Sequence, residues 1–279
     1  MQRGRSGVGQ YVLALVRALL GETDRHDFTL FVLEEDLPLF RFAAPAMTLV
    51  PVAERFRPAV RNVLWHQFRL PALARRHQLD VLHVPSYRRL LWSRPCALVA
   101  TVHDLAPFRV PKKYDLARMA YGRLVVPRLA RRQDEIIAIS EFTAADIATF
   151  LGRPRAPVRV IPNGLDHARF RPGSRAGAKA LVGRRHGVHQ PFFLYVARLE
   201  HPAKNHARLI AAFNGFKAAT GSRWKLVLAG SDWHGAAVVH DLIRRSAFAR
   251  DIHSLGFLPD ADLPELYRAA DLFVFPSLF

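Results

Sequence analysis

The sequence has few cysteines and no long apolar run, and each shortage disfavours a class of protein. The only cysteine, Cys96, cannot form an intramolecular disulfide, and this favours a reducing compartment. The apolar runs are far shorter than the ~20 residues that a membrane-spanning helix needs, and the first residues show no secretory pattern. We therefore expect a cytoplasmic protein without a transmembrane helix.

Acidic residues are scarce as well. The chain has 23 Asp and Glu against 41 Lys and Arg, which gives a net charge of +18 and a pI near 11.2. Such a charge attracts polyanions, which include nucleic acid, an anionic membrane surface and phosphorylated small molecules. Nucleic acid is disfavoured, because the sequence contains no recognised nucleic-acid-binding module and no cluster of aromatic residues for base stacking.

Arginines gather in the first half of the chain, mainly in residues 55–78 and 88–94. In residues 55–78 they alternate with Leu, Phe and Trp at helical spacing, a pattern typical of a basic amphipathic helix on a membrane surface. An ordinary solvent-exposed helix in an arginine-rich protein has the same composition, and the sequence favours this second interpretation. Peripheral association with the inner face of the plasma membrane therefore stays an open alternative.

The length of 279 residues and the 50% hydrophobic composition suit two domains of ordinary size. Short apolar runs rich in β-branched and aromatic residues alternate with helical patterns, which predicts parallel sheets in a doubly wound α/β fold. The predicted strands are residues 28–33, 47–52, 80–84, 97–104, 135–140 and 158–163 in the first half, and 192–198, 224–230, 251–257 and 272–277 in the second.

Residues 167–191 interrupt this alternation with several glycines, two prolines and no strand. We therefore predict a first domain over residues 1–170, a linker and leading helix over 171–191, and a second domain over 192–279. The first domain starts on a glycine turn with no strand before it, and the second has only four predicted strands. We therefore expect both domains to be incomplete.

Two predicted strand ends carry residues suited to chemistry. His103 and Asp104 follow a buried strand, at the edge where open α/β sheets bind ligands. Arg198 ends another strand, and Lys204 precedes a helix, so that two cations suited to a diphosphate lie at the mouth of that helix. The alternatives are a structural histidine and two solvated loop cations.

The start of the chain has a third candidate. Gly7 and Gly9 precede a helix predicted over residues 9–20, and glycines there let backbone amides approach an anion closely. A tight turn at a helix start explains the same two glycines. A dinucleotide-binding dehydrogenase is disfavoured, because Val12 occupies the place of the third glycine of the G-x-G-x-x-G motif.

The order of the motifs resembles one family. After the glycine turn come "VHD" (102–104), "AISEFTAADI" (138–147), "VRVIPNGLDHARF" (158–170), "FFLYVARLEHPAKNHARLIAAF" (192–213), "LVLAGSDW" (226–233) and "GFLPDADLPELYRAADLFVFPS" (256–277). This succession resembles the GT-B glycosyltransferases of family GT4, the glycosyl transferases group 1, and especially their bacterial mannosyltransferase-type members.

The resemblance implies two Rossmann-like domains and the retaining transfer of a sugar from a nucleotide-diphosphate sugar. It implies a glycan or lipid-linked acceptor, in the synthesis of a cell-envelope polysaccharide or glycolipid. It also implies no metal and no cofactor besides the donor substrate, for which GDP-mannose is a guess. Residue by residue, it implies a catalytic role near the transferred sugar for His103, donor-diphosphate binding for Arg198, Lys204, Gly7 and Gly9, and nucleotide-base binding for Gly256, Phe257 and Leu258.

The sequence departs from the family pattern at one important place. Members follow the "FPS" motif with a Glu-x7-Glu loop whose carboxylates handle the sugar and the ribose, whereas this sequence ends at Phe279, before either glutamate. The alternative function is therefore a catalytically inactive, nucleotide-sugar-binding remnant.

Overall fold

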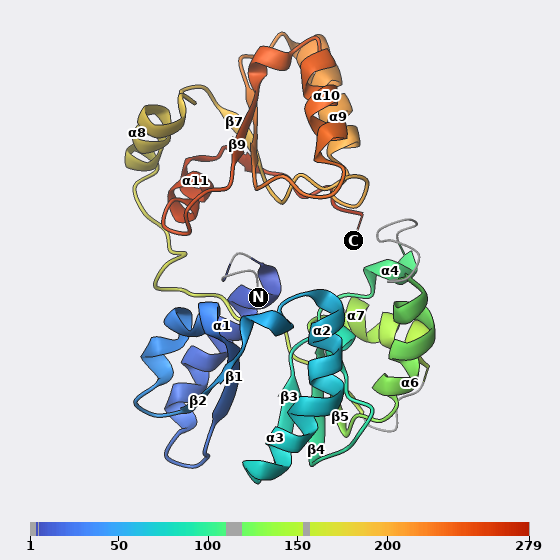
Figure 1. Cartoon of the computed structure of the whole chain (residues 1–279). Coiled ribbons are helices and arrows are strands. Elements are labelled where there is room, and N and C mark those ends of the chain that lie inside the picture. The colour runs from blue at the N-terminus through green and yellow to red at the C-terminus, as the bar shows by residue number, and fades with distance from the viewer. Residues whose placement is uncertain (1–3, 5, 110–118, 153–156, 279) are drawn as a thin grey trace. The chain divides into compact units, whose positions relative to one another are not determined.

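The computed structural model describes residue 4 and residues 6–109, 119–152 and 157–278 of the chain. The chain divides into two compact units, of which unit 1 covers residues 1–164 and unit 2 covers residues 165–279 (Figure 1). Both units are α/β, and all strand pairs in them are parallel. This confirms the predicted fold class.

Unit 1 contains a two-stranded sheet and a four-stranded sheet. The first has the order β1 (Thr29–Leu33), β2 (Thr48–Val52), and the second has the order β3 (Val81–Val84), β4 (Ala97–Val102), β5 (Glu135–Ala138), β6 (Val158–Val160). The α-helices that lie wholly within its described residues are α1 (Gly7–Leu19), α2 (Ala59–Leu64), α3 (Leu70–Arg76), α4 (Ala106–Arg109), α6 (Val126–Ala130) and α7 (Glu141–Asp146).

Short helical turns of other types complete unit 1. The 3-10 turns are Leu20–Glu22, Glu34–Ala43, Glu54–Phe56 and Tyr87–Arg89, and the π turns are Trp65–Arg69, Tyr121–Val125 and Ile147–Leu151. The π turn Trp65–Arg69 joins α2 to α3 without a break. Each strand of the unit lies within a predicted range, because a strand covered on both faces needs an unbroken apolar run.

The core of unit 1 forms around β4 and β5. Leu98, Ala100 and Val102 of β4 are fully buried, and Ile136 and Ala138 of β5 lie beside them. A polar cap fixes where α7 begins. Ser140 Oγ accepts a hydrogen bond of 3.1 Å from the backbone N–H of Thr143, as expected of a residue at the N-cap of α7.

Unit 2 has one sheet with helices on both faces. The strand order is β10 (Leu272–Phe273), β7 (Phe192–Val196), β8 (Lys225–Ala229), β9 (Ile252–Gly256). Helices α8 (Arg175–His186) and α11 (Leu263–Ala269) pack on one face, and α9 (His206–Thr220) and α10 (Ala236–Arg245) pack on the other (Figure 1). A 3-10 turn, Ala249–Asp251, precedes β9.

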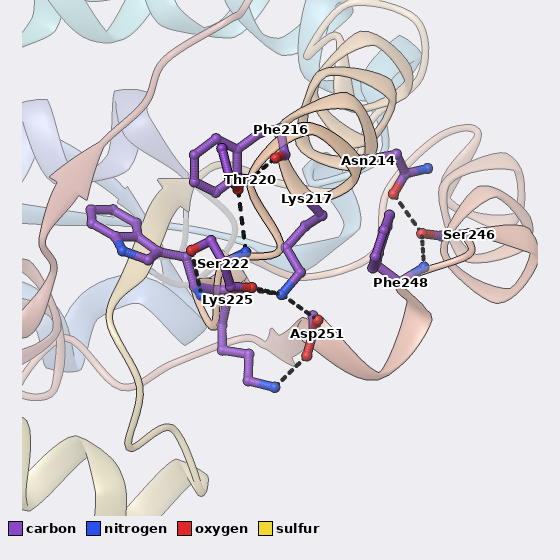
Figure 2. Close-up of polar contacts among 10 residues, drawn as sticks. Asn214, Phe216, Lys217, Thr220, Ser222, Lys225, Ser246, Phe248 and Asp251 are labelled. Carbon is purple, nitrogen blue, oxygen red and sulfur yellow. Dashed lines mark hydrogen bonds and ion pairs between the residues drawn. The ribbon is translucent and has the colours of Figure 1, made fainter.

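An ion-pair cluster occupies the edge of this sheet where β8 and β9 begin (Figure 2). The Nζ of Lys217 lies 2.7 Å from a carboxylate oxygen of Asp251, and Lys225 donates to the other oxygen. Lys217 also donates to the carbonyl groups of Ser222 and Trp224, which follow the end of α9. These contacts bind α9 to two strand starts, so this edge is structural and the site is to be sought at the opposite edge.

Candidate functional site

In unit 2 the loops that follow β7 and β8 run side by side at the carboxyl edge of the sheet. The backbone N–H of Leu199 donates to the carbonyl of Ser231 (3.0 Å), and the N–H of Trp233 donates to the carbonyl of Leu199 (3.1 Å). These bonds extend the pairing of the two strands beyond their ends. Side chains from both loops are therefore held together where ligands of open α/β sheets bind.

Gly230 makes this close approach possible. An added Cβ at this glycine would lie 2.0 Å from the carbonyl oxygen of Ala197, closer than any real side chain comes. The N–H of Gly230 donates to the carbonyl of Gly256 at 2.8 Å, which brings the end of β9 to the same place. A glycine directly after an apolar run is the sequence signal of such an approach.

Arg198 is held between an aromatic ring and a carboxylate. Its guanidinium lies 4.5 Å over the ring of Trp233, and one of its NH2 groups lies 3.4 Å from an oxygen of Glu200. The side chain of Glu200 is buried, whereas that of Arg198 is 38% exposed. Because stacking uses the face of a guanidinium, the in-plane N–H groups of Arg198 remain able to bind an anion.

Lys204 follows in the same loop, on a backbone fixed from two sides. The hydroxyl of Tyr195 donates to the carbonyl of Lys204 (2.9 Å), and the N–H of Lys204 donates to the carbonyl of Glu200 (3.2 Å). Its Nζ lies 5.9 Å from the ring centroid of Phe275. The "FPS" motif thus lies beside this loop, and the side chain of Asn205 donates to the carbonyl of Pro276 at 2.9 Å.

His206, the first residue of α9, adds no charge to this cluster at neutral pH. Its side chain is fully buried, with its ring 5.1 Å from that of Tyr195. Burial, with smaller effects from Lys204 and His201, lowers the pKa of His206 to about 4. The positive charge at the mouth of α9 therefore comes from Arg198 and Lys204.

The three predicted base-binding residues differ in exposure. Gly256 ends β9 with a φ of +67°, which favours glycine. The side chain of Phe257 is 49% exposed, whereas Leu258 packs into the core with α8 and α11. Leu258 can therefore reach a ligand at this edge only through its backbone, and Phe257 can also offer its ring.

In unit 1 the predicted residue His103 lies at the carboxyl ends of β3 and β4. Its Nε2–H donates to the carbonyl of Pro85 (3.2 Å), which leaves Nδ1 as the acceptor nitrogen of the neutral ring. Tyr11 of α1 packs edge-on against this ring, with centroids 4.7 Å apart. Burial lowers the pKa of His103, although the bond to Pro85 and the charge of Asp104 act in the opposite direction.

A hydrogen-bond network supports this arrangement. The Tyr11 hydroxyl lies 3.3 Å from Oγ1 of Thr101, and Nε2 of His83 lies 2.8 Å from the same oxygen. Burial, together with the nearby His103, lowers the pKa of His83. The network therefore connects the first helix with the ends of two strands, beside the ring of His103.

Gly7 and Gly9 lie inside the first turn of α1, because the helix begins at Gly7, two residues earlier than predicted. Ser6 is the N-cap, and its Oγ accepts from the N–H of Gly9 at 3.1 Å. This cap accounts for the earlier start. Tyr11, one turn farther along the same helix, connects this turn to His103.

The sequence did not single out Tyr11, His83, Glu200 or Trp233 as site residues. The partners of Tyr11, His83 and Trp233 come from other strands or loops, and only pairing at a sheet edge brings them together. Glu200 pairs with Arg198 within one loop. In the described part of the chain, no group of three or more His, Cys, Asp or Glu residues could hold a metal ion. Among the described helices, none is long and apolar enough to cross a membrane.

Solved structures of glycosyltransferases share this fold. HepE of Anabaena, crystallised with UDP and glucose, matches with a TM-score of 0.70 at 19% identity, over 98% of this chain and 71% of that one. WaaG, a glycosyltransferase involved in lipopolysaccharide biosynthesis, matches with a TM-score of 0.67 at 15% identity, over 98% of this chain and 72% of that one. The fold is therefore GT-B.

Two curated relatives with similar sequences are also glycosyltransferases. O-antigen chain mannosyltransferase B of Escherichia coli is 28% identical over 182 residues, which are 65% of this chain and 47% of the relative. A D-inositol 3-phosphate glycosyltransferase of Salinispora arenicola is 31% identical over 205 residues, which are 67% of this chain and 44% of the relative. The match to this chain thus covers less than half the length of each relative.

Two family models match consecutive parts of the chain. The model of Glycosyltransferase Family 4 matches residues 5–169, which is more than half of the chain, and the model of Glycosyl transferases group 1 matches residues 184–279. The predicted resemblance is thereby confirmed, and the chain belongs to the family 4 (group 1) glycosyltransferases of the GT-B fold.

Proposed function

We propose that the protein transfers a sugar, with retention of configuration, from a nucleotide-diphosphate sugar to a glycan or lipid-linked acceptor. The product would be a cell-envelope polysaccharide or glycolipid. Family membership supports a transferase of this type. The observation that carries the proposal is the orientation of Arg198, which Trp233 and Glu200 hold at the same sheet edge as Lys204.

The chemistry of the leaving group explains why this arrangement suits the reaction. When the bond to the sugar breaks, negative charge develops on the diphosphate, and fixed positive groups stabilise it. The planar guanidinium of Arg198 can bind two phosphate oxygens at once, while the ammonium of Lys204 adds a point charge. The proposal therefore includes no metal ion and no cofactor, and EDTA is expected to leave donor binding unchanged.

His103 is proposed to contact the transferred sugar. Because its Nε2–H is bonded to Pro85, its Nδ1 can accept a hydrogen bond from a sugar hydroxyl. The lowered pKa keeps the ring neutral at pH 7, so that this acceptor is present. Gly7 and Gly9 are proposed to lie near the same donor, on the helix whose Tyr11 fixes His103.

Two comparisons bear on the base of the donor. The relative from Escherichia coli is named a mannosyltransferase, which supports GDP-mannose, whereas HepE was crystallised with UDP-glucose. Gly256, Phe257 and Leu258 are proposed to lie by the base, with the Phe257 ring as a stacking surface. Calorimetric titration of GDP, UDP and their sugar derivatives into the chain would identify the preferred base.

The same calorimetry tests the diphosphate site. Arg198→Ala and Lys204→Ala should each weaken nucleoside-diphosphate binding by about 1.5–3 kcal/mol, the range for hydrogen bonds to charged groups. Arg250→Ala is the matched control, because Arg250 is exposed near the amino end of β9, at the opposite edge of the sheet. Unchanged affinity in both site variants would contradict the proposed function.

A further inference from the structure

α2, the π turn Trp65–Arg69 and α3 follow one another as one helical rod (Figure 1). This rod has apolar side chains on two opposite faces. Toward the sheet, Trp65, Leu70 and Ala74 are buried in the core with β2, β3 and β4. Away from it, Val60 is 73% exposed, Leu64 50% and Phe68 73%. Only the inward residues stabilise the fold by burial, so the outward ones have no role in the core.

The three outward residues form a row. They are spaced four residues apart, so they lie along one side of the helix. Trp92, which is 57% exposed, lies on a segment tied to the same rod, because its backbone N–H donates to the side chain of Gln67 (2.9 Å). Single exposed apolar residues are common, but three of them in a row along one side of a helix are typical of an interaction site.

The charge around this row has one sign. No Asp or Glu occurs between Arg55 and Leu79. Four exposed arginines flank the row on the same rod, and none of them pairs with a carboxylate of any described residue; they are Arg61, Arg69, Arg75 and Arg76. A fifth, Arg132, stacks over the Trp92 ring at 5.4 Å.

We propose that this surface, Val60, Leu64, Phe68 and Trp92 with the flanking arginines, docks on a membrane that contains anionic phospholipids. An anionic bilayer offers apolar chains beside phosphate groups, which match the apolar row and the arginines together. A nucleic-acid duplex would match only the arginines. The docking rests on the exposure and charge of these residues, whereas its use, access to a lipid-linked acceptor, rests on the proposed function.

Vesicle co-sedimentation of the chain tests the proposal. On vesicles of equal parts phosphatidylcholine and phosphatidylglycerol, the partition coefficient should be at least about tenfold higher than on phosphatidylcholine alone, and it should fall as salt rises. Equal partitioning on the two kinds of vesicle, or none on either, would overturn the proposal.

The apolar part is tested by the triple variant Val60→Ser, Leu64→Ser, Phe68→Ser. It should lower partitioning on the anionic vesicles by about tenfold or more, because the apolar area that enters the bilayer is lost. Val238→Ser on α10, where the side chain is 44% exposed, is the control and should change little. Equal effects of the two changes would contradict a localised surface.

The basic part is tested by two variants with the same change in net charge. The first variant removes three arginines of the surface and consists of Arg61→Gln, Arg69→Gln and Arg75→Gln. The second removes three exposed arginines of unit 2 and consists of Arg184→Gln, Arg223→Gln and Arg250→Gln. The first should weaken vesicle binding several-fold more than the second. If both lower it equally, the attraction comes from overall charge and the proposal fails.

Further measurements control for folding and for a different kind of partner. Circular dichroism should show that all variants are folded, and calorimetry should show that the serine variant binds nucleoside diphosphate like the wild type. A dimer that dissociates in the serine variant, or single-stranded DNA binding that the variant also loses, would replace the membrane with another partner and overturn the proposal. Failure of the proposed function would give a different result: Arg198→Ala would bind nucleoside diphosphate like the wild type, while vesicle binding of the chain stayed intact.

Discussion

The guanidinium of Arg198 lies 4.5 Å over the ring of Trp233. The two residues come from the loops after β7 and β8, and the N–H of Trp233 holds its loop in place by donating to the carbonyl of Leu199. The tryptophan thus limits the rotamers of the arginine before any ligand arrives. A pre-oriented cation loses less conformational entropy when it binds a phosphate.

Trp233→Ala is expected to weaken nucleoside-diphosphate binding by roughly 0.5–2 kcal/mol, because the cation–π contact that orients Arg198 is lost. Trp233→Phe should retain part of the affinity, since it keeps an aromatic face. Calorimetry measures both, with Trp92→Ala in unit 1 as the control for removing an exposed tryptophan. An alanine variant with wild-type affinity would show that Trp233 does not position Arg198.

Gly230→Ala is expected to destabilise unit 2 by more than about 3 kcal/mol, because the new methyl group would overlap the carbonyl of Ala197. Gly215→Ala is the matched control: Gly215 lies within α9 with nothing near its Cβ position, so alanine should stabilise by about 0.5–1 kcal/mol. Urea unfolding followed by circular dichroism compares the two. If the two substitutions changed the free energy of unfolding equally, the loops after β7 and β8 could move apart without loss of stability.

The ion-pair cluster in Figure 2 predicts acid sensitivity of unit 2. Burial raises the pKa of Asp251, but hydrogen bonds from Lys217 and Lys225 outweigh it, and the net pKa is lowered. A carboxyl group with a lowered folded-state pKa stabilises the fold above its unfolded pKa of about 4, and this contribution is lost as the pH falls. Stability should therefore decline below about pH 5.

Asp251→Asn isolates this contribution. It should cost about 1–3 kcal/mol at pH 7, because the charged partner of two lysines is removed, and it should flatten the decline in acid. Thermal unfolding at pH 7, 5 and 3 gives both quantities. The control is Asp27→Asn, an exposed carboxylate that forms no ion pair with a described residue. An unchanged pH profile in Asp251→Asn would place the acid sensitivity elsewhere.

Tyr11→Ala is expected to raise the pKa of His103 toward its ordinary value of about 6.5, because the packed ring that keeps water away is removed. Tyr11→Phe should leave this pKa nearly unchanged, since the ring contact remains and only the hydroxyl contact with Thr101 is lost. Histidine NMR titration measures the pKa in each variant. If alanine and phenylalanine give the same value as tyrosine, the contact does not keep His103 neutral.

Much of the fold was predictable, because strands and caps depend on residues close in the sequence. All ten strands of the described chain lie within ranges predicted from apolar runs. Ser140 caps its helix as its position before Glu141–Asp146 indicates. The exact start of α1 was not predicted, because the cap at Ser6 competes with the tendency of the glycines to form a turn.

The candidate site was predictable only where a single residue follows a strand. His103 and Arg198 were proposed in this way, because the carboxyl ends of parallel strands are where ligands bind, whereas Gly256 was proposed only from the family resemblance. The residues that hold these side chains in place were not predicted. Tyr11 meets Thr101 across 90 residues, and Trp233 reaches Arg198 only because two loops continue a strand pair. No local pattern carries such contacts.

The sequence by itself determined the α/β class, the places of the strands and the strongly basic charge, because each depends on composition or on short-range periodicity. It could not decide which apolar residues of the arginine-rich helix are buried. Trp65 and Phe68 are three residues apart and similar in character, yet the first is 7% exposed and the second 73%. Only the packing of one helix face against the sheet separates them, and it leaves the other face as a surface.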